Sequence, residues 1–212
     1  MVKRGGGVEG LRFRKLGEQI IVVELLVNVK DSMGANVVNT IAEHTAPFIE
    51  EKILQQGRVG IRILSNLCTE RMTMVKFEIP VQKMAWKGAT GQSVAEKIVE
   101  AYQFADSDQY RATTHNKGIM NGIDAVAVAT GQDWRAIESA AHSYASMGGS
   151  YSPLTKYHIE NGVLHGSIEM PISVGTKGGA IKSNPSYSNT LKILGYPDAV
   201  ELAQIMLSVG LS

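Results

Sequence analysis

The sequence predicts an α+β fold in which a small sheet-plus-helix unit is joined to a larger, mainly helical unit. Strand-like apolar density dominates residues 1–65, where one helical pattern lies between strands. From residue 66 onward, helical periodicity prevails and strands are few. We therefore expect a domain junction near Ser65 and Asn66, with one domain at 1–65 and a second at 66–212.

The first unit contains most of the predicted strands. Runs rich in Val, Ile, Leu or Phe and bounded by Gly, Asn or Pro predict strands at residues 11–14, 19–29, 59–64 and 72–81. Residues 31–57 predict a helix that Asp31 or Ser32 can cap and that Gly57 ends. Pro47 should kink or restart this helix, because proline lacks the N–H of a helical hydrogen bond.

The second unit is dominated by helical spacing. Its periodicity predicts helices at residues 93–105, 118–130, 134–146 and 198–211. Residues 154–171 predict a β-hairpin, because Asn161-Gly162 is a favoured pair for a tight hairpin turn. With 212 residues, the chain can bury a core without disulfides or metals.

The composition excludes several classes of protein. The 21 basic and 20 acidic side chains leave a net charge of +1, which gives no indication of nucleic-acid or membrane-surface binding. The single cysteine, Cys68, excludes an internal disulfide, fits a reducing compartment and is expected to be a small buried hydrophobe. The best apolar run, residues 20–29, is interrupted by Glu24 and is much shorter than the ~20 residues of a membrane span. No export signal follows Met1, so we expect a cytoplasmic protein.

Residues 31–36, DSMGAN, join a predicted strand to a predicted helix start. Free backbone N–H groups and the positive end of a helix dipole suit a phosphate at such a place. An ordinary helix cap is the alternative, since Asp31 or Ser32 would compete with an anion for the same donors. The pattern alone leaves both interpretations open.

A second stretch gathers hydrogen-bond donors directly before a predicted helix start, namely Arg111, His115, Asn116 and Lys117. The group contains no acidic side chain and suits a carboxylate or a polarised carbonyl. Lys117 at a helix start would interact unfavourably with the helix macrodipole, which indicates a functional role for this lysine. The plain alternative is a solvated lysine in a loop.

The relation between Lys117 and Asp133 poses a distance problem. Sixteen residues separate them, which corresponds to ~24 Å along a straight helix at about 1.5 Å per residue. Either the chain folds back after Gly131, or Lys117 meets the Asp133 of a second subunit. On the pattern alone, Asp133 is equally well explained as the N-cap of the next helix. Asn121 follows Lys117 by one helical turn and should face the same side.

Other motifs give weaker signals. Residues 169–180, EMPISVGTKGGA, run from a strand into a glycine-rich loop that permits close approach of a ligand, but match neither a Walker loop nor a GxGxxG fingerprint. Paired spacing and nearby carboxylates, which metal ligation needs, are missing around His44, His142, His158 and His165. We therefore expect no metal site. No GxSxG, CxxC or HExxH motif occurs.

Taken together, DSMGANVVNT, YRATTHNKGIMNGIDAVAVATGQDWRAIE and PISVGTKGG resemble, in order and spacing, hydroxymethylglutaryl-coenzyme A (HMG-CoA) reductase of the soluble class II type. The resemblance covers essentially all 212 residues. It implies interconversion of HMG-CoA with mevalonate and free coenzyme A by two hydride transfers from NADH or NADPH. Residues 1–65 would be part of a ferredoxin-like dinucleotide-binding domain, and residues 66–212 part of a substrate and catalytic domain.

The resemblance also implies roles for single residues. Lys117 matches the lysine that polarises the thioester and aldehyde oxygens, and Asp133 the aspartate that tunes this lysine. An ammonium aimed at a developing oxyanion stabilises charge that grows in the transition state. The positions that match substrate-binding residues are Asn66, Arg111 and Asn121. Those that match the dinucleotide-binding stretch are Asp31, Met33, Gly34 and Asn36.

The family implied by the resemblance forms dimers with interfacial active sites, which would let Lys117 meet Asp133 across subunits. An upstream proton-donating glutamate and a downstream histidine that protonates the coenzyme A thiolate have no counterpart here. We therefore expect a central fragment that is inactive or nearly so by itself, since loss of a general acid costs roughly 10²–10⁴-fold. The rival interpretation is a module that binds nucleotide or coenzyme A without turnover.

Overall fold

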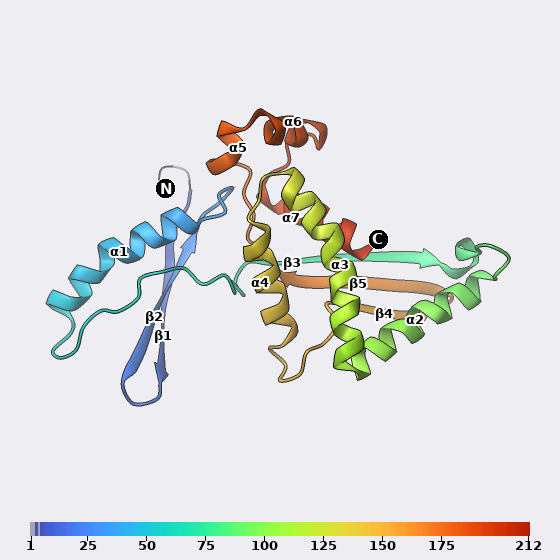
Figure 1. Cartoon of the computed structure of the whole chain (residues 1–212), viewed down its shortest axis with the longest axis horizontal. Helices are drawn as coiled ribbons and strands as arrows, with labels where there is room; N and C mark the ends of the chain where they lie inside the picture. Colours follow the sequence, from blue (N-terminus) through green and yellow to red (C-terminus); the bar gives the residue numbers. More distant parts are fainter. Residues whose placement is uncertain (1–2, 4) are drawn as a thin grey trace. The chain divides into compact units, whose positions relative to one another are not determined.

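The computed structural model describes residue 3 and residues 5–212 (Figure 1). The chain divides into two compact units, Met1–Ser65 and Asn66–Ser212. Over the described residues it contains seven α-helices, a short 3₁₀ helix and two small antiparallel sheets. The predicted α+β class is therefore confirmed. Within this described part, no helix has the length and apolar character required to cross a membrane.

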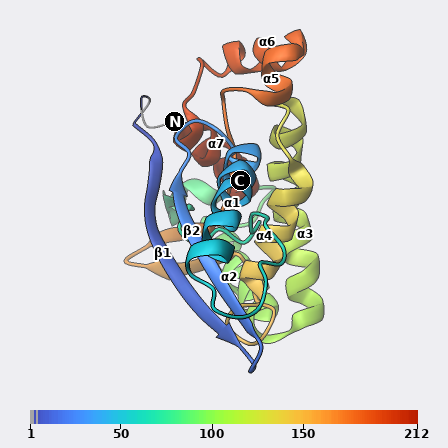
Figure 2. The ribbon, with the colours of Figure 1, turned by 90° about the vertical axis from the view of Figure 1, so that its left-hand side faces the viewer.

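The first unit is a β-hairpin followed by one helix. Strands β1 (Gly7–Leu16) and β2 (Ile20–Asn28) pair antiparallel, with an irregularity between Val8 and Gly10. Figure 2 shows the two strands as a long twisted ribbon. Helix α1 (Ala35–Lys52) comes next and is continuous through Pro47, so the predicted restart at this proline is wrong.

Two other expectations for the first unit are also wrong. The N-cap of helix α1 is Gly34, at a φ of 105°, and not the predicted caps Asp31 or Ser32, and the helix ends at Lys52, before Gly57. Residues 59–64 form no strand, because no described strand pairs with them. Ile61 and Ile63 are 91% and 66% exposed, whereas Val59 and Leu64 are half-buried. An alternating pattern makes a strand only where a neighbouring edge accepts its hydrogen bonds.

The second unit is built on a three-stranded antiparallel sheet in the order β3-β5-β4. Its strands are β3 (Met72–Pro80), β4 (Thr155–Glu160) and β5 (Val163–Pro171). The predicted hairpin turn is confirmed, because Asn161 and Gly162 have positive φ values of 50° and 75°. One sheet face is buried and the other exposed, as alternation in an antiparallel sheet produces.

Six helices accompany this sheet: α2 (Gly91–Ser107), α3 (Gln109–Ala129), α4 (Trp134–Ala145), α5 (Gly179–Ser183), α6 (Pro185–Ile193) and α7 (Ala199–Leu211). The sequence pattern predicts the four longest of them, although α3 begins nine residues before its predicted start at residue 118. The pattern does not predict the short helices α5 and α6 or the 3₁₀ helix η2 (Val81–Met84).

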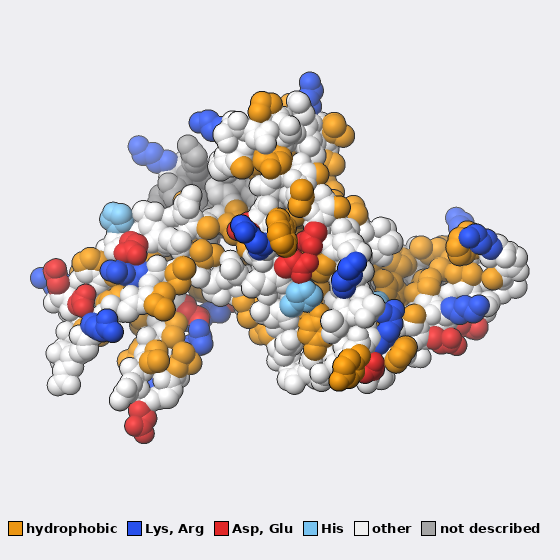
Figure 3. Space-filling view, viewed as in Figure 1, with side chains coloured by type: hydrophobic (Ala, Val, Ile, Leu, Met, Phe, Trp, Pro, Cys, Tyr) orange, Lys and Arg blue, Asp and Glu red, His pale blue; other side chains and the backbone are white. Residues whose placement is uncertain are grey.

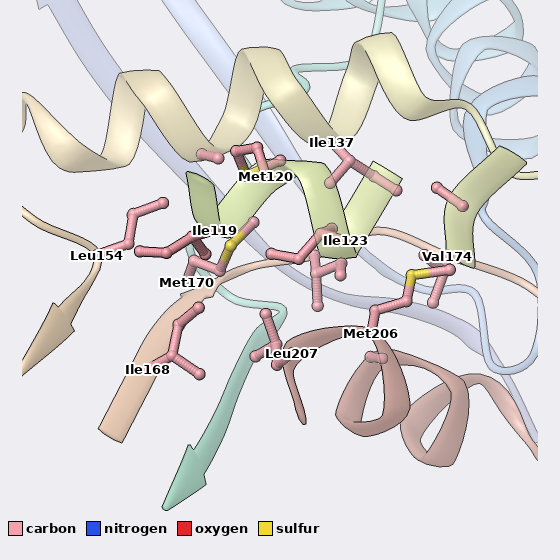
Figure 4. Packing of buried hydrophobic residues seen from close by; sticks show 14 of the residues in the cluster. Ile119, Met120, Ile123, Ile137, Leu154, Ile168, Met170, Val174, Met206 and Leu207 are labelled. Carbon is pink, nitrogen blue, oxygen red and sulfur yellow. The ribbon is translucent and has the colours of Figure 1, made fainter. Parts of the chain in front are cut away.

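The core of the second unit lies between the sheet and helices α3, α4 and α7. Figure 4 shows Met120 and Ile123 of α3, Ile168 of β5, and Met206 and Leu207 of α7 among the buried side chains that converge there. Helices α3 and α7 approach closely through glycines. A Cβ on Gly122 would lie 2.7 Å from the carbonyl oxygen of Val209. This packing holds α3 firmly, with one side buried and the other exposed.

Candidate functional site

Helix α3 carries the donor group Arg111, His115, Asn116 and Lys117, followed by Asn121. It is 21 residues long and begins after Asp108, whose Oδ2 accepts a hydrogen bond from the Arg111 amide at 3.0 Å. Lys117 therefore lies well inside a helix, and the prediction that it stands at a helix start is wrong. The macrodipole argument for Lys117 fails with it, because the dipole acts on the first and last turns.

Two members of the donor group, Asn116 and His115, link α3 to another segment by hydrogen bonds. Asn116 is fully buried, its Nδ2 donates to the carbonyl of Ser152 at 2.9 Å, and its Oδ1 accepts from the amide of Leu154 at 2.9 Å. His115 Nε2 lies 2.6 Å from Thr155 Oγ1. Burial lowers the pKa of His115, and the positive charge of Arg111 lowers this pKa further. These hydrogen bonds hold α3 to the segment that leads into β4.

Lys117 and Asn121 are exposed on α3, where their spacing of four residues places them on one side of the helix. Arg111 is half-buried and comes six residues before Lys117, which puts it about 120° around the helix from that lysine. The structure thus brings Lys117 and Asn121 together on an open face. It places Arg111 on a neighbouring side, and Asn66 lies exposed in a turn at the start of the second unit.

Asp133 caps helix α4, because its Oδ1 accepts a hydrogen bond from the Ala136 amide at 3.1 Å. The N-cap interpretation is therefore confirmed. Helix α3 continues for twelve residues after Lys117, so its end lies ~18 Å along the axis from this lysine. Over the described residues, no ion pair joins Lys117 to Asp133. One chain does not bring these two side chains together.

Gln132, beside Asp133, ties the α3–α4 turn to the glycine-rich loop. Its Nε2 donates to the carbonyl of Gly175 at 2.8 Å, and its Oε1 accepts from the amide of Gly175 at 2.9 Å. The GQD and VGTKGG motifs are therefore neighbours in space. The loop continues into an open hollow of about 590 Å³ whose lining includes Lys177 and Asn184. The sequence does not predict this link, because its partners are 43 residues apart.

The residues expected to bind a dinucleotide surround the start of α1 in the first unit. Gly34 is buried, and a Cβ there would lie 2.8 Å from Val29 Cγ1. Asn36 is exposed, while Asp31 and Met33 are half-buried. The first turn of α1 contains no acidic residue, and its N-cap, Gly34, makes no side-chain cap hydrogen bond. The backbone N–H groups at such a helix start suit an anion.

A carboxyl pair that the sequence does not predict lies between α3 and α4. Asp124 follows Lys117 by seven residues on the same side of α3, and its Oδ1 is buried without a hydrogen-bond partner among the described residues. Glu138 Oε2 lies 2.6 Å from His142 Nε2, and His142 Nδ1 lies 2.7 Å from the Tyr151 hydroxyl. Figure 3 shows acidic side chains and a histidine together over α3 and α4.

Asp124 should make stability depend on pH. Burial, followed by the hydrogen bond and charge of Glu138, raises the pKa of Asp124 from 3.8 to about 7. Because the folded pKa is the higher one, the contribution of Asp124 to stability is complete below about pH 4 and is lost as pH rises through about 7. Asp124→Asn should make the free energy of unfolding depend less on pH between about pH 4 and about pH 7. Urea denaturation across this pH range measures the free energy of unfolding. Asp106 is exposed, so the control substitution Asp106→Asn should leave the pH dependence of that free energy unaltered.

The histidines and the cysteine differ from their predicted settings. His158 and His165 are direct cross-strand partners, and Glu78 and Glu160 lie beside them, so the expectation that they lack nearby carboxylates is wrong. Strand pairing, which sequence spacing does not reveal, brings them together. Cys68 is a free thiol and is half-buried, where full burial was expected.

Comparison with known proteins agrees with this fold and this order of motifs. Residues 1–212 match the family model described as hydroxymethylglutaryl-coenzyme A reductase. The chain belongs to this family, which confirms the resemblance seen in the sequence. The curated 3-hydroxy-3-methylglutaryl-coenzyme A reductase of Archaeoglobus fulgidus is 46% identical over 216 residues, which cover 100% of this chain and 48% of the relative.

Solved structures of the class II enzyme give the same picture. The class II reductase of Streptococcus pneumoniae bound to NADPH in open conformations matches with a TM-score of 0.93 and 43% identity, covering 99% of this chain and 51% of that one. A second structure from Streptococcus pneumoniae has a TM-score of 0.93 and 42% identity, and 57% of it is covered. A probable reductase of Borreliella burgdorferi is 36% identical, with 49% of its length covered. The chain spans about half the length of these relatives.

Proposed function

We propose that the protein acts as a class II HMG-CoA reductase, interconverting HMG-CoA with mevalonate and coenzyme A through two hydride transfers. The main support is Lys117, which is exposed in mid-helix on α3, beside Asn121 and free of an ion pair among the described residues. Membership of the reductase family along all 212 residues supports a catalytic role for this lysine. The Streptococcus pneumoniae relative bound to NADPH supports NADPH as cofactor.

Lys117 is the group proposed to polarise the substrate. Its ammonium would meet the thioester oxygen and later the aldehyde oxygen, where negative charge grows as hydride arrives. Asn121 would donate a hydrogen bond to the same substrate, and Arg111 and Asn66 would hold its carboxylate and other oxygens. The open face of α3 leaves room for this ligand, because Lys117 and Asn121 both lie at the surface.

The first unit, residues 1–65, is proposed as the dinucleotide-binding domain, part of a ferredoxin-like fold. The cofactor phosphates would meet the backbone N–H groups at the start of α1, where Asn36 is exposed. Asp31 and Met33 would contact the rest of the cofactor. The second unit, residues 66–212, would bind the substrate. A cytoplasmic location remains a prediction from the composition.

A homodimer with shared sites would explain the separation of Lys117 from Asp133. Within one chain the turn that holds Asp133 follows an end of α3 ~18 Å from the lysine, beyond the reach of both side chains. A second subunit could place its own Asp133 beside Lys117 and tune the ammonium. Asp133 is suited to this role because it is exposed while it caps α4.

The experiment that tests the function follows nicotinamide absorbance with HMG-CoA and NADPH or NADH, using the full gene product. Consumption that requires HMG-CoA is the expected result, with mevalonate and free coenzyme A as products. Binding of NADPH without consumption would contradict it and support the rival interpretation, a binding module. The 212-residue chain assayed in parallel tests whether these residues alone suffice.

A further inference from the structure

The exposed face of the three-stranded sheet carries two histidines and two glutamates that the proposed reductase site does not use. Strand pairing sets His165 of β5 opposite Glu78 of β3 on one side and opposite His158 of β4 on the other. Glu160 follows His158 by two residues, so its side chain emerges on the same face. The hairpin turn at Asn161 and Gly162 fixes this register.

The four side chains lie close enough to act together. His158, Glu160 and His165 each offer a ligand atom, and these three atoms lie within 4.8 Å of one another. The two imidazole rings are stacked, with centroids 4.8 Å apart and an interplanar angle of 9°. Two atoms on one zinc ion are at most about 4.2 Å apart, since Zn–N bonds are about 2.1 Å. Small rotations of exposed side chains would close the remaining gap.

We propose that this face binds one divalent cation of the zinc class through His158, His165 and Glu160. Two imidazole nitrogens and one carboxylate oxygen are a donor set that zinc, nickel and copper favour, whereas calcium and magnesium require oxygen ligands. Three protein ligands leave the fourth tetrahedral position to water. The ion would lie near the turn end of the sheet, on the row next to the one that contains Lys76 and Lys156.

Glu78 completes the arrangement as an orienting residue. Its Oε1 lies 3.5 Å from Nδ1 of His165. A histidine ring that gives its Nδ1–H to a carboxylate keeps the other nitrogen free for a metal, and the carboxylate makes that nitrogen more basic. The set therefore includes both the direct ligands and the outer carboxylate that zinc-binding histidines commonly have.

Calorimetric titration of zinc into the tag-free protein tests the proposal, with no need for reductase activity. One ion per chain is expected, with affinity lowered at least tenfold in His158→Asn and His165→Asn, and about 10–100-fold in Glu78→Gln. The matched control is His44→Asn, an exposed histidine on α1, which should bind zinc as the unaltered protein does. Circular dichroism verifies that each variant is folded.

Copper(II) provides an independent readout of the ligands. Its electron paramagnetic resonance spectrum should show coupling to two imidazole nitrogens in the unaltered protein and to one in His158→Asn. The proposal is overturned if zinc binds equally well to His158→Asn, if His44→Asn weakens binding as much, or if the unaltered protein binds no zinc.

Discussion

Lys117→Ala in the full gene product is expected to lower kcat for reduction of HMG-CoA by about 10²–10³-fold or more, the loss found when one donor to an oxyanion is removed. NADPH binding should change little, because this lysine is proposed to contact the substrate and the dinucleotide stretch lies in the first unit. Stability should also be nearly unchanged, since Lys117 is exposed and forms no ion pair among the described residues.

Steady-state kinetics with a parallel NADPH-binding titration measures both quantities. Lys97→Ala is the matched control, because Lys97 is also an exposed lysine within a helix of the second unit. This control should keep full activity. Survival of reduction in Lys117→Ala would refute the assignment of the lysine, and an equal loss in both variants would point to a general effect of charge.

Asn116→Ala should lower the free energy of unfolding by about 2–4 kcal/mol, since buried groups that lose their hydrogen-bond partners each cost about 1–3 kcal/mol. The substitution removes the acceptor of the Leu154 amide and the donor to the Ser152 carbonyl. Both bonds join α3 to the segment before β4, so their loss frees two distant parts of the chain from each other.

Urea denaturation measures this change, and Asn121→Ala provides the control on the same helix. Asn121 is exposed, so its replacement should alter the free energy of unfolding by no more than about 0.5 kcal/mol. Equal effects of the two substitutions would show that the hydrogen bonds of Asn116 do not stabilise the fold.

Local patterns predict the fold where the signals lie close together in the sequence. Asn161-Gly162 sets the β4–β5 turn, and Asp198 is the N-cap of helix α7 and forms a capping box with Glu201. The start of α3 is different. Residues 113–116, Thr-Thr-His-Asn, are weak helix formers, and tertiary bonds from His115 and Asn116 hold them helical. Residues 59–64 are predicted as a strand but do not form one, because apolar alternation does not supply a partner strand.

In the candidate site, too, the sequence predicts some features, whereas others depend on contacts between distant residues. Family motifs identify Lys117 and Asp133, and helical spacing places Asn121 beside the lysine. The sequence does not predict the bonds of Gln132 with Gly175, the pairing of Asp124 with Glu138, or the stacking of His158 on His165. Each of these joins residues from separate elements or paired strands. Only the folded chain shows which of the donors near Lys117 are exposed and which are buried.

The measurement that most directly tests the proposed site mixes two inactive variants of the full gene product, Lys117→Ala and Asp133→Ala. After subunit exchange, a mixed dimer with sites shared between subunits contains one site with both Lys117 and Asp133. The account predicts that reductase activity returns on mixing, although each variant alone is inactive. A mixture that exchanges subunits and stays inactive would contradict it, because each site would then take both residues from one chain.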